Sequence, residues 1–424
     1  MIKRLKLFIL ILFQTTAIYF VTELVRGLAG RPFRPVNYLV MGALVTCWTL
    51  IHSKRAVGVP GYAKRLATGG TSGHIPYLDC LRVLATVLVI STHVLSYAAS
   101  QFPAGAAAWD LLTIFSSLFL CCNLLFIMIS GALLLNARPE SVPVFYKKRL
   151  LRVLVPAFAY YLFYCFDATG IALFYPSNWG ALLLDFIGNR RDLTPHFWLI
   201  YVVIGCYLTA PFFSIMVKHM TRQMMDALAA VIFITHISFT YLPYAGVTIP
   251  FTTFMASWES VFLLGYFCSL DFTSRQYRMW AGCGILSVLV FIVTILTRDD
   301  YAALLYYNAP PMLFLSCAVF TWFKRLGAKC MDRIPVWISV ISRYSYSILL
   351  IHWYVFFQVI VNKVGFDILS FGTAGGIAIS VLLTLVLSLL AAFVLDNTVV
   401  LCLETLVLRV VDFKRDGVDK RDHV

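Results

Sequence analysis

Arg82 and His93 place a guanidinium and an imidazole eleven residues apart in the otherwise apolar stretch YLDCLRVLATVLVISTH. On an α-helix, eleven residues make three turns with about 20° of drift, so both side chains share one face, roughly 16 Å apart along the axis. Such groups are expensive inside a membrane, so they mark a candidate functional site. A neutral imidazole can take up a proton, which makes His93 a candidate general base.

Further polar residues lie at the ends of apolar runs. Asp79 precedes Arg82 by three positions, which predicts an i,i+3 ion pair at a helix end. Arg149 and Arg152 have the same spacing and should face the same way, in a geometry that suits phosphate. Glu259 is an intramembrane carboxylate, and it could partner a histidine or accept hydrogen bonds from sugar hydroxyls. His196, Trp198 and His352 could orient a substrate or support His93.

Each of these residues also has a structural interpretation. A histidine can bond to a neighbouring helix, and we interpret His236 in this way. Aromatic residues at span ends usually form interfacial belts. Paired arginines usually reflect the excess of positive charge in cytoplasmic loops. We do not interpret Ser130 as a nucleophile, because no base lies at local spacing; Ser130–Gly131 instead predicts a close helix contact. The eleven cysteines have no paired spacing that suggests zinc or a disulfide framework, so no metal is expected.

The composition predicts an all-α polytopic integral membrane protein whose first partner is the lipid bilayer. The 424 residues are 61% hydrophobic and only 13% charged, whereas about 25% is usual for soluble proteins. The net charge of +14 invites a nucleic-acid interpretation. We reject it, because lysine and arginine stand in short clusters between apolar runs, as in cytoplasmic membrane loops.

Apolar runs predict about twelve membrane-spanning helices. An N-terminal pair (1–52) is followed by a cytoplasmic linker (53–75), a ten-helix core (76–395), and a C-terminal apolar segment with a charged cytoplasmic tail (396–424). The core spans are expected near 77–99, 109–135, 152–173, 195–217, 224–243, 252–270, 279–297, 302–323, 339–361 and 372–395. The stretch 398–411 is short for a crossing and is expected along or just inside the membrane.

The charge distribution orients these spans. With a cytoplasmic N-terminus, the expected outer segments hold few of the 34 lysines and arginines: Arg26, Arg31, Arg34, Arg190, Arg191, Arg298 and Lys363. The positive-inside bias therefore predicts two cytoplasmic termini, with Arg82 at the cytoplasmic end and His93 toward the outer end.

Four segments in order resemble the membrane acyltransferase-3 family, the O-antigen and exopolysaccharide O-acyltransferases. The family's mark is an arginine, ten residues and a histidine, which Arg82 and His93 match. The other three are NLLFIMISGALLL (123–135), YKKRLLRVLVP (146–156) and SYSILLIHWYV (345–355). In addition, PHFWLIYVVIGCYLTAPF (195–212) is similar to the subgroup related to enterobacterial surface-glycan O-acetyltransferases. The resemblance covers about residues 75–395, and the N-terminal pair departs from the family's ten spans.

The resemblance implies an O-acyltransferase of the bacterial cytoplasmic (inner) membrane. It would move an acyl group, acetyl in the first instance, from cytoplasmic acyl-CoA to a hydroxyl of a cell-surface glycan or its lipid-linked precursor. Acetyl-CoA is the expected donor, held by Arg82, Arg149 and Arg152. His93 and Glu259 are the expected catalytic residues. Some family members carry an extra soluble domain, and a separate periplasmic partner could supply that role here.

Two other functions stay open at this point. A proton-coupled secondary transporter could use His93, Glu259 and His352 as a relay, although no inverted repeat is visible in the sequence. The second open function is that of a non-catalytic flippase or assembly partner for a glycan intermediate. Acetyl-CoA-dependent acetylation by the purified protein would separate the enzyme from the transporter.

Overall fold

The computed structural model describes residues 75–137, 141–170, 175–188, 193–330, 334–401, 403, 404 and 407. Within these ranges every regular element is a helix. Eight helical segments are long and apolar enough to cross a membrane, which confirms the predicted all-α polytopic class. The predicted N-terminal pair, nearly all of the linker and the charged tail lie outside the described residues.

The α-helices follow one another along the chain with short 3₁₀ and π-helical segments between some of them. Their bounds are α4 (Pro76–Ala99), α5 (Ala107–Phe119), α6 (Cys121–Leu135), α7 (Val142–Arg149), α8 (Val155–Thr169), α9 (Pro176–Ile187), α10 (Trp198–His219), α11 (Arg222–Tyr241), α12 (Trp258–Ser269), α13 (Ser274–Thr297), α14 (Tyr301–Leu305), α15 (Pro310–Cys330), α16 (Val336–Trp353) and α17 (Thr373–Leu395). The π-helical segments are Leu150–Leu154, Tyr354–Lys363 and Asp396–Val400.

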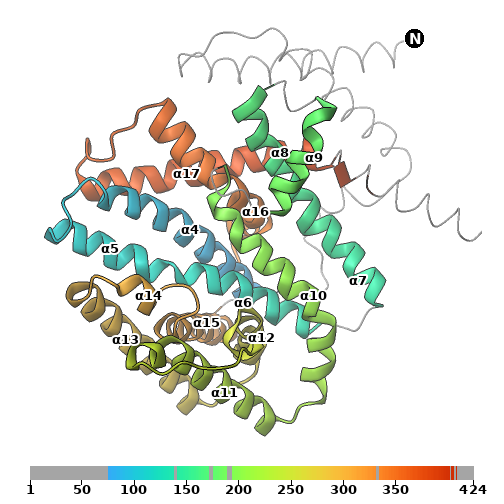
Figure 1. The fold of residues 1–424 in the computed structure, drawn as a ribbon, viewed down its shortest axis with the longest axis vertical. Coiled ribbons are helices and arrows are strands. Elements are labelled where there is room, and N and C mark those ends of the chain that lie inside the picture. Colours follow the sequence, from blue (N-terminus) through green and yellow to red (C-terminus); the bar gives the residue numbers. More distant parts are fainter. Residues whose placement is uncertain are drawn as a thin grey trace, which may run out of the picture.

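Helix α4 is the one around which the others pack. It contacts α5, α6, α15, α16 and α17, and Figure 1 shows it in blue between α17 and α5. Buried residues occur around most of its circumference, as expected for a helix enclosed by protein. This enclosure places Arg82 and His93 inside the bundle, where polar groups can find protein partners.

Helices α6 and α12 cross at very short range. A Cβ atom added to Gly131 would lie 1.9 Å from the Phe262 carbonyl oxygen, and one added to Gly265 would lie 2.0 Å from that of Met128. Small residues let helix backbones approach in this way. The close helix contact predicted at Ser130–Gly131 is therefore confirmed, and it fixes the position of α12.

Two predicted spans differ from what the structure contains. The run at 252–270 forms only α12, whose 12 residues reach about 18 Å, well short of a bilayer core of about 30 Å. Most of α12 is buried by its neighbours, so it passes through protein instead of lipid. The run at 302–323 is divided, because Tyr301–Leu305 forms the separate helix α14 and α15 begins at Pro310.

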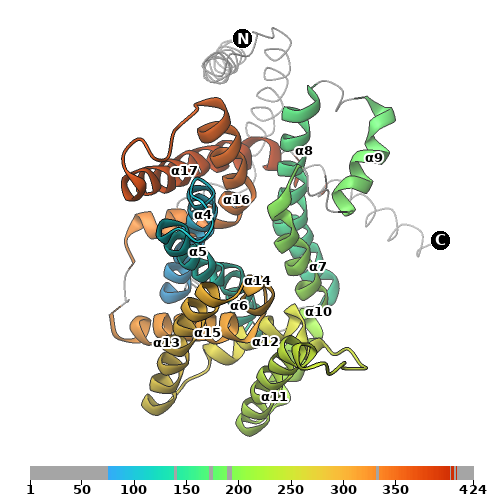
Figure 2. The same ribbon diagram turned by 60° about the vertical axis from the view of Figure 1, so that its left-hand side comes forward.

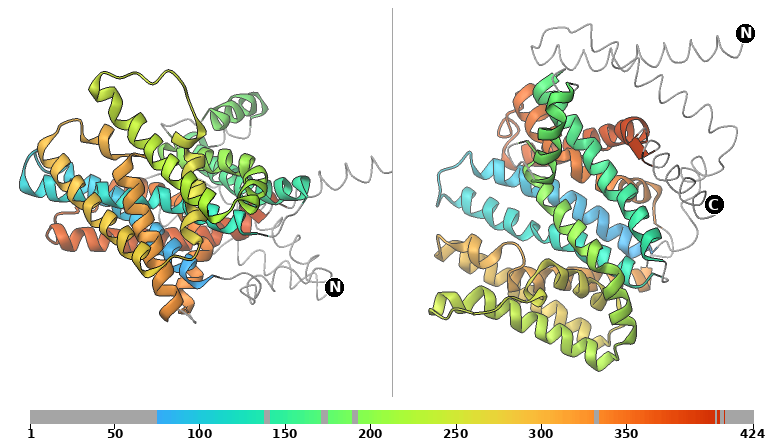
Figure 3. Two further views of the ribbon diagram at one scale, coloured as in Figure 1. Left: turned by 90° about the horizontal axis from the view of Figure 1, so that it is seen from below. Right: turned by 45° about the vertical axis from the view of Figure 1, so that its right-hand side comes forward.

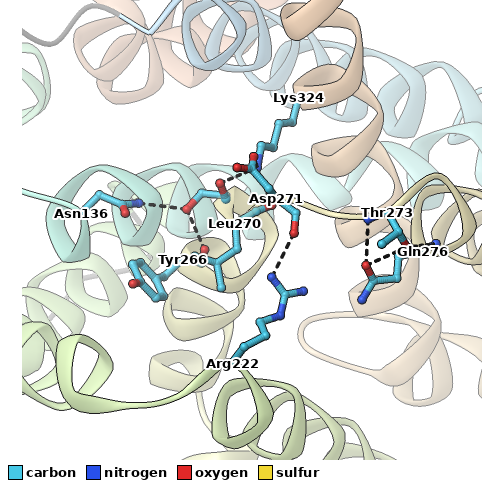
Figure 4. Close-up of polar contacts among 9 residues, drawn as sticks. Asn136, Arg222, Tyr266, Leu270, Asp271, Thr273, Gln276 and Lys324 are labelled. Carbon is cyan, nitrogen blue, oxygen red and sulfur yellow. Dashed lines mark hydrogen bonds and ion pairs between the residues drawn. The ribbon is translucent and has the colours of Figure 1, made fainter.

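Polar contacts from three other helices hold the C-terminal end of α12 (Figure 4). The Lys324 ammonium donates to the Ser269 carbonyl at 2.6 Å, and Arg222 donates to the Asp271 carbonyl at 3.0 Å. Asn136, just after α6, donates to the Ser269 hydroxyl at 2.9 Å. The last carbonyls of a helix lack partners within it and attract cations. Lys324 satisfies this need at Ser269, and the other two contacts anchor the chain around the same helix end.

The elements alternate between two ends of the bundle, which we call the Arg82 end and the His93 end. The cluster in Figure 4 gathers the ends of α6, α12 and α15 with the starts of α11 and α13. Lys218, near the end of α10, joins them by donating to the Ala137 carbonyl at 2.8 Å. Gly327 of α15 abuts Tyr77 at the start of α4, which makes this the Arg82 end. Figures 2 and 3 show the long helices of this bundle from further sides.

Candidate active site

Helices α4 and α10 carry polar side chains at matching intervals. His196 and Tyr207 are eleven residues apart, as Arg82 and His93 are. Arg82 and His93 share one face of α4 about 16 Å long, whereas His196 lies in the 3₁₀ turn Pro195–Phe197 that leads into α10. The helices run in opposite directions, because α4 begins and α10 ends at the Arg82 end. His196 therefore belongs to the His93 end, and Tyr207 to the Arg82 end.

Helix α16 repeats the interval with Ser342 and Trp353. Ser342 hydrogen-bonds to Arg82 at 3.0 Å, and the Trp353 ring lies 4.9 Å from the His93 ring, centroid to centroid. One polar stripe on each of three helices thus contributes to both ends. Tyr207, Ser342 and Trp353 were not predicted as site residues, because only the packing of the helices brings them to Arg82 and His93.

At the Arg82 end the guanidinium is fixed by two partners. Arg82 Nη1 donates to Asp79 Oδ1 at 3.0 Å and to Ser342 Oγ at 3.0 Å, and Ser342 Oγ donates to the same carboxylate oxygen at 2.5 Å. The predicted i,i+3 ion pair is confirmed. Because Ser342 also ties the pair to α16, the arginine is held in one orientation inside the bundle.

Arg149 lies at the same end, and its surroundings differ from those of Arg152. The Arg149 guanidinium covers the rings of Phe145 and Tyr207, at 5.0 and 5.6 Å from their centroids, while Arg152 is exposed. The chain turns π-helical at Leu150, between the two arginines, so the α-helical spacing behind the prediction that both face the same way does not hold there. Bonds of the i→i+5 type widen the turn and rotate residues three apart away from each other.

Tyr207 connects the residues of the Arg82 end. Its ring lies under Arg149, and its hydroxyl is 3.3 Å from the hydroxyl of Ser130 on α6. It is also close enough to Arg82 for an electrostatic interaction. The Arg82 end thus combines two guanidinium groups with two hydroxyls from four helical segments, a set that suits an anionic group.

At the His93 end three imidazoles come together. The rings of His93 and His352 are 5.2 Å apart, and those of His352 and His196 are also 5.2 Å apart, centroid to centroid. His352 is fully buried and His196 is 7% exposed, whereas His93 is half-buried. The histidine with access to a ligand is therefore the one that shares a stripe with Arg82.

Backbone carbonyls fix the two buried rings. His196 Nε2 donates to the Leu350 carbonyl at 3.0 Å, and His352 Nδ1 donates to the Leu349 carbonyl at 2.8 Å. Trp353 lies between the outer members of the group, edge-to-face with His93 and stacked on His196 at 6.1 Å. The structure thus brings His93, His196 and His352 into one cluster on α4, α10 and α16.

Glu259 lies on another face of α10. Its Oε1 would be 3.9 Å from a Cβ added to Gly205, and its Oε2 accepts a 2.5 Å hydrogen bond from Ser257. Gly205 is nine residues, about 14 Å, further along α10 than His196. The structure therefore does not place Glu259 beside the histidines, and its role as acceptor for a sugar hydroxyl stays a prediction.

Trp198 shares the face of α10 that Glu259 meets, being two turns from Gly205. Its ring is 5.5 Å from that of Trp258 and 5.9 Å from that of Tyr307. Tyr307 is 63% exposed and adopts a left-handed backbone conformation with φ 57°. This conformation is unfavourable for a residue with a side chain and often occurs at functional sites.

Asp396 is a carboxylate that the sequence analysis did not single out. It begins the π-helical segment that continues α17, beyond the predicted end of the last span at residue 395. Its carboxylate accepts hydrogen bonds from Tyr160 at 2.9 Å and from Ser347 at 2.6 Å. An acidic residue inside a candidate span (Thr373–Val400) was the available signal.

A comparison with known families shows which protein family the chain belongs to. A family model described as an acyltransferase domain matches residues 75–393, which include both ends of the site. The chain belongs to acyltransferase family 3. It is accordingly an enzyme, a membrane-embedded acyltransferase. No curated protein and no solved structure matches the chain.

Proposed function

We propose that this acyltransferase moves an acetyl group from acetyl-CoA on the cytoplasmic side to a hydroxyl of a cell-surface glycan or its lipid-linked precursor. The observation that carries the proposal is the separation of two polar sites along one stripe of α4. Cationic groups gather at the Arg82 end and imidazoles at the His93 end, roughly 16 Å apart. A donor with phosphates at one end and a thioester on a long arm matches that separation.

The Arg82 end would hold the phosphates. Arg149 combines its charge with stacking on Phe145 and Tyr207, and planar guanidinium groups bind phosphate oxygens in fixed geometry. Arg82 is already bound to Asp79 and Ser342, so it presents its remaining donors in a preset direction. Exposed Arg152 would contribute through long-range attraction rather than by direct contact.

The reaction takes place at His93 in this proposal. The hydroxyl oxygen attacks the thioester carbonyl carbon while His93 takes the hydroxyl proton. The new C–O bond forms, the C–S bond breaks, and the leaving thiolate takes the proton from the imidazolium, so His93 ends as it began. The products are an acetyl ester and free coenzyme A.

The acceptor would approach from the His93 end. Trp198, Trp258 and Tyr307 form an aromatic group there, and aromatic faces combine an apolar surface with defined geometry. The Glu259 carboxylate, next to Trp258, could accept hydrogen bonds from sugar hydroxyls. We propose that this surface binds the sugar units next to the one that is acetylated, because α10 lies between the surface and the histidines.

The test uses the protein reconstituted in liposomes with radiolabelled acetyl-CoA and lipid-linked glycan extracted from cells that lack the gene. We expect label in the glycan with wild-type protein and none above background with His93→Ala. Mass spectrometry of surface glycans from cells with and without the gene should show a difference of one acetyl group. If labelled acetyl-CoA is never consumed while a glycan crosses the bilayer, the transport alternative replaces this proposal.

A further inference from the structure

Two nitrogen atoms in the histidine cluster are buried without a hydrogen-bond partner. They are Nε2 of His352 and Nδ1 of His196, both among the buried polar atoms that no described residue satisfies. Leaving a buried polar atom without a partner destabilises the folded protein. Such atoms in a functional site therefore call for a partner that arrives or rotates during the reaction.

The carbonyl contacts determine which kind of partner each atom needs. A carbonyl oxygen can only accept, so the His352 nitrogen that faces the Leu349 carbonyl, Nδ1, carries a proton. In a neutral imidazole the other nitrogen then carries a lone pair. The same argument gives His196 a proton on Nε2, which faces Leu350, and a lone pair on Nδ1. Both unpartnered atoms are acceptors, and they cannot satisfy each other.

His93 is the member of the cluster that can donate. Its ring is half-buried and makes no hydrogen bond to His196 or His352. The His93 ring lies 5.2 Å from the His352 ring, centroid to centroid, and the two ring planes are tilted by 31°. Two imidazoles joined by one N–H···N bond of about 3 Å have centroids roughly 5 Å apart. The spacing of the two rings therefore fits such a bond once the His93 ring turns its N–H toward His352.

Two side chains beside His196 do not supply a donor to its Nδ1. The Tyr164 hydroxyl donates to the Leu350 carbonyl at 3.1 Å. Trp353 presents its ring face to His196, with only 18° between the two planes, so its N–H does not point at that ring. His93 contacts the ring of His352 directly, which favours His352 over His196 as its partner.

We propose that His352 is a positioning residue whose Nε2 accepts the N–H of His93 and so sets the tautomer of the general base. The other nitrogen of His93 then carries its lone pair toward the acceptor hydroxyl. During the reaction His93 alone gains and loses a proton, while His352 keeps its Nδ1 proton on the Leu349 carbonyl. This inference rests on the proposed function, because it assigns His352 a part in the same transfer.

Paired substitutions separate this role from simple packing. His352→Gln keeps a side-chain oxygen that can accept a hydrogen bond, whereas His352→Leu keeps bulk alone. We expect His352→Leu to lower kcat about 10²–10⁴-fold, the usual range for a lost positioned base, with both KM values within about threefold of wild type. His352→Gln should retain kcat to within about tenfold.

His236→Gln is the matched control. His236 is another buried histidine, bonded to Ser260 at 2.8 Å and outside the cluster, and its substitution should leave kcat and both KM values within about twofold. Equal loss in His352→Gln and His352→Leu would overturn the proposal. So would a change that appears in KM alone.

A spectroscopic measurement tests the tautomer without any assay of activity. In ¹⁵N-histidine-labelled protein, the signals absent from His352→Gln belong to His352, and we expect a protonated Nδ1 and an unprotonated Nε2. A protonated Nε2 overturns the inference even if transfer is observed. An inactive wild-type protein that shows the expected tautomer instead contradicts the proposed function.

Discussion

Arg149 and Arg152 differ in surroundings although three positions separate them. Arg149 is packed on two rings at the Arg82 end, while Arg152 is exposed. We expect Arg149→Ala to raise the KM for acetyl-CoA about 10–100-fold, since a hydrogen bond to a charged group contributes about 1.5–3 kcal/mol. Arg152→Ala should raise it less than about threefold.

The measurement is the initial rate against donor concentration at saturating acceptor, with expression and membrane insertion checked by immunoblot. Arg149→Lys gives a further comparison, because it keeps the charge without the planar fork, and its KM should fall between wild type and alanine. Equal KM changes for Arg149→Ala and Arg152→Ala would show that the two act only through general positive charge.

In the proposed mechanism, His93 is the residue on which the transfer depends most. His93→Ala should lower kcat by about 10²–10⁴-fold while binding of acetyl-CoA to the Arg82 end, measured by equilibrium dialysis, stays within about twofold. His93→Gln should fail equally, because an amide hydrogen-bonds but takes no proton near neutral pH. A glutamine variant with near-normal kcat would make His93 a structural residue.

Residue-level prediction from the sequence succeeded where spacing along one helix decides the outcome. The ion pair of Asp79 with Arg82 follows from i,i+3 geometry. Its third member, Ser342, is 260 positions from Arg82, and only the packing of α16 on α4 brings it there. The π-helical turn after Arg149 is equally invisible to periodicity, because its i→i+5 bonds depend on tertiary context.

At the scale of elements, the crossing of α6 and α12 is the tightest contact near the site. Gly131→Ala would push a methyl group into the Phe262 backbone, and neither backbone can yield as a flexible side chain can. Overpacking of this kind typically costs about 1–3 kcal/mol. We expect the detergent-solubilised variant to melt several degrees below wild type by fluorescence-detected size exclusion.

Gly282→Ala in α13 is the matched control, because a Cβ atom there meets nothing within 4 Å. Its melting temperature should equal or slightly exceed that of wild type, since alanine favours helix over glycine. A Gly131→Ala protein as stable as the Gly282→Ala protein would contradict the close crossing. Ser130 is adjacent to Gly131, so transfer should also weaken in the less stable variant.

Sequence analysis at this scale found the long apolar helices but not how the short ones are used. From hydropathy alone, the segments that form α12 and α15 are predicted to be ordinary membrane-spanning helices. The structure instead gives α12 only 12 residues, and its C-terminal end is held by Lys324 and Arg222 from other helices and by Asn136, just after α6. Partners supplied by tertiary packing leave no periodic pattern in the sequence.

At the scale of the whole molecule, we expect the Arg82 end to face the cytoplasm. A reporter inserted at Gly105, which follows α4 at the His93 end in open space, should read as external. One inserted between His219 and Thr221, in the turn that joins α10 to α11, should read as cytoplasmic. Opposite readings of an alkaline phosphatase and green fluorescent protein pair would reverse the direction proposed for acetyl transfer.

The alternation of the two ends was predictable, because successive spans cross the membrane in opposite directions. The positive-inside bias predicts which end faces the cytoplasm, and that side stays a prediction. The starts and ends of helices meet at the Arg82 end in the alternation that the spans implied. Which helices are neighbours was not predictable, since apolar faces carry little specific information. The three eleven-residue stripes could be matched to one another only after α4, α10 and α16 had been seen together.

The shortness of α12 has a consequence for how the protein is made. Lys324 lies 55 residues downstream of Ser269, whose carbonyl it completes, so α12 leaves the ribosome long before its cap exists. A 12-residue segment cannot settle across lipid by itself. We therefore expect the C-terminal end of α12 to be completed only after α15 has been made, and the newly made chain to present an incomplete bundle until then.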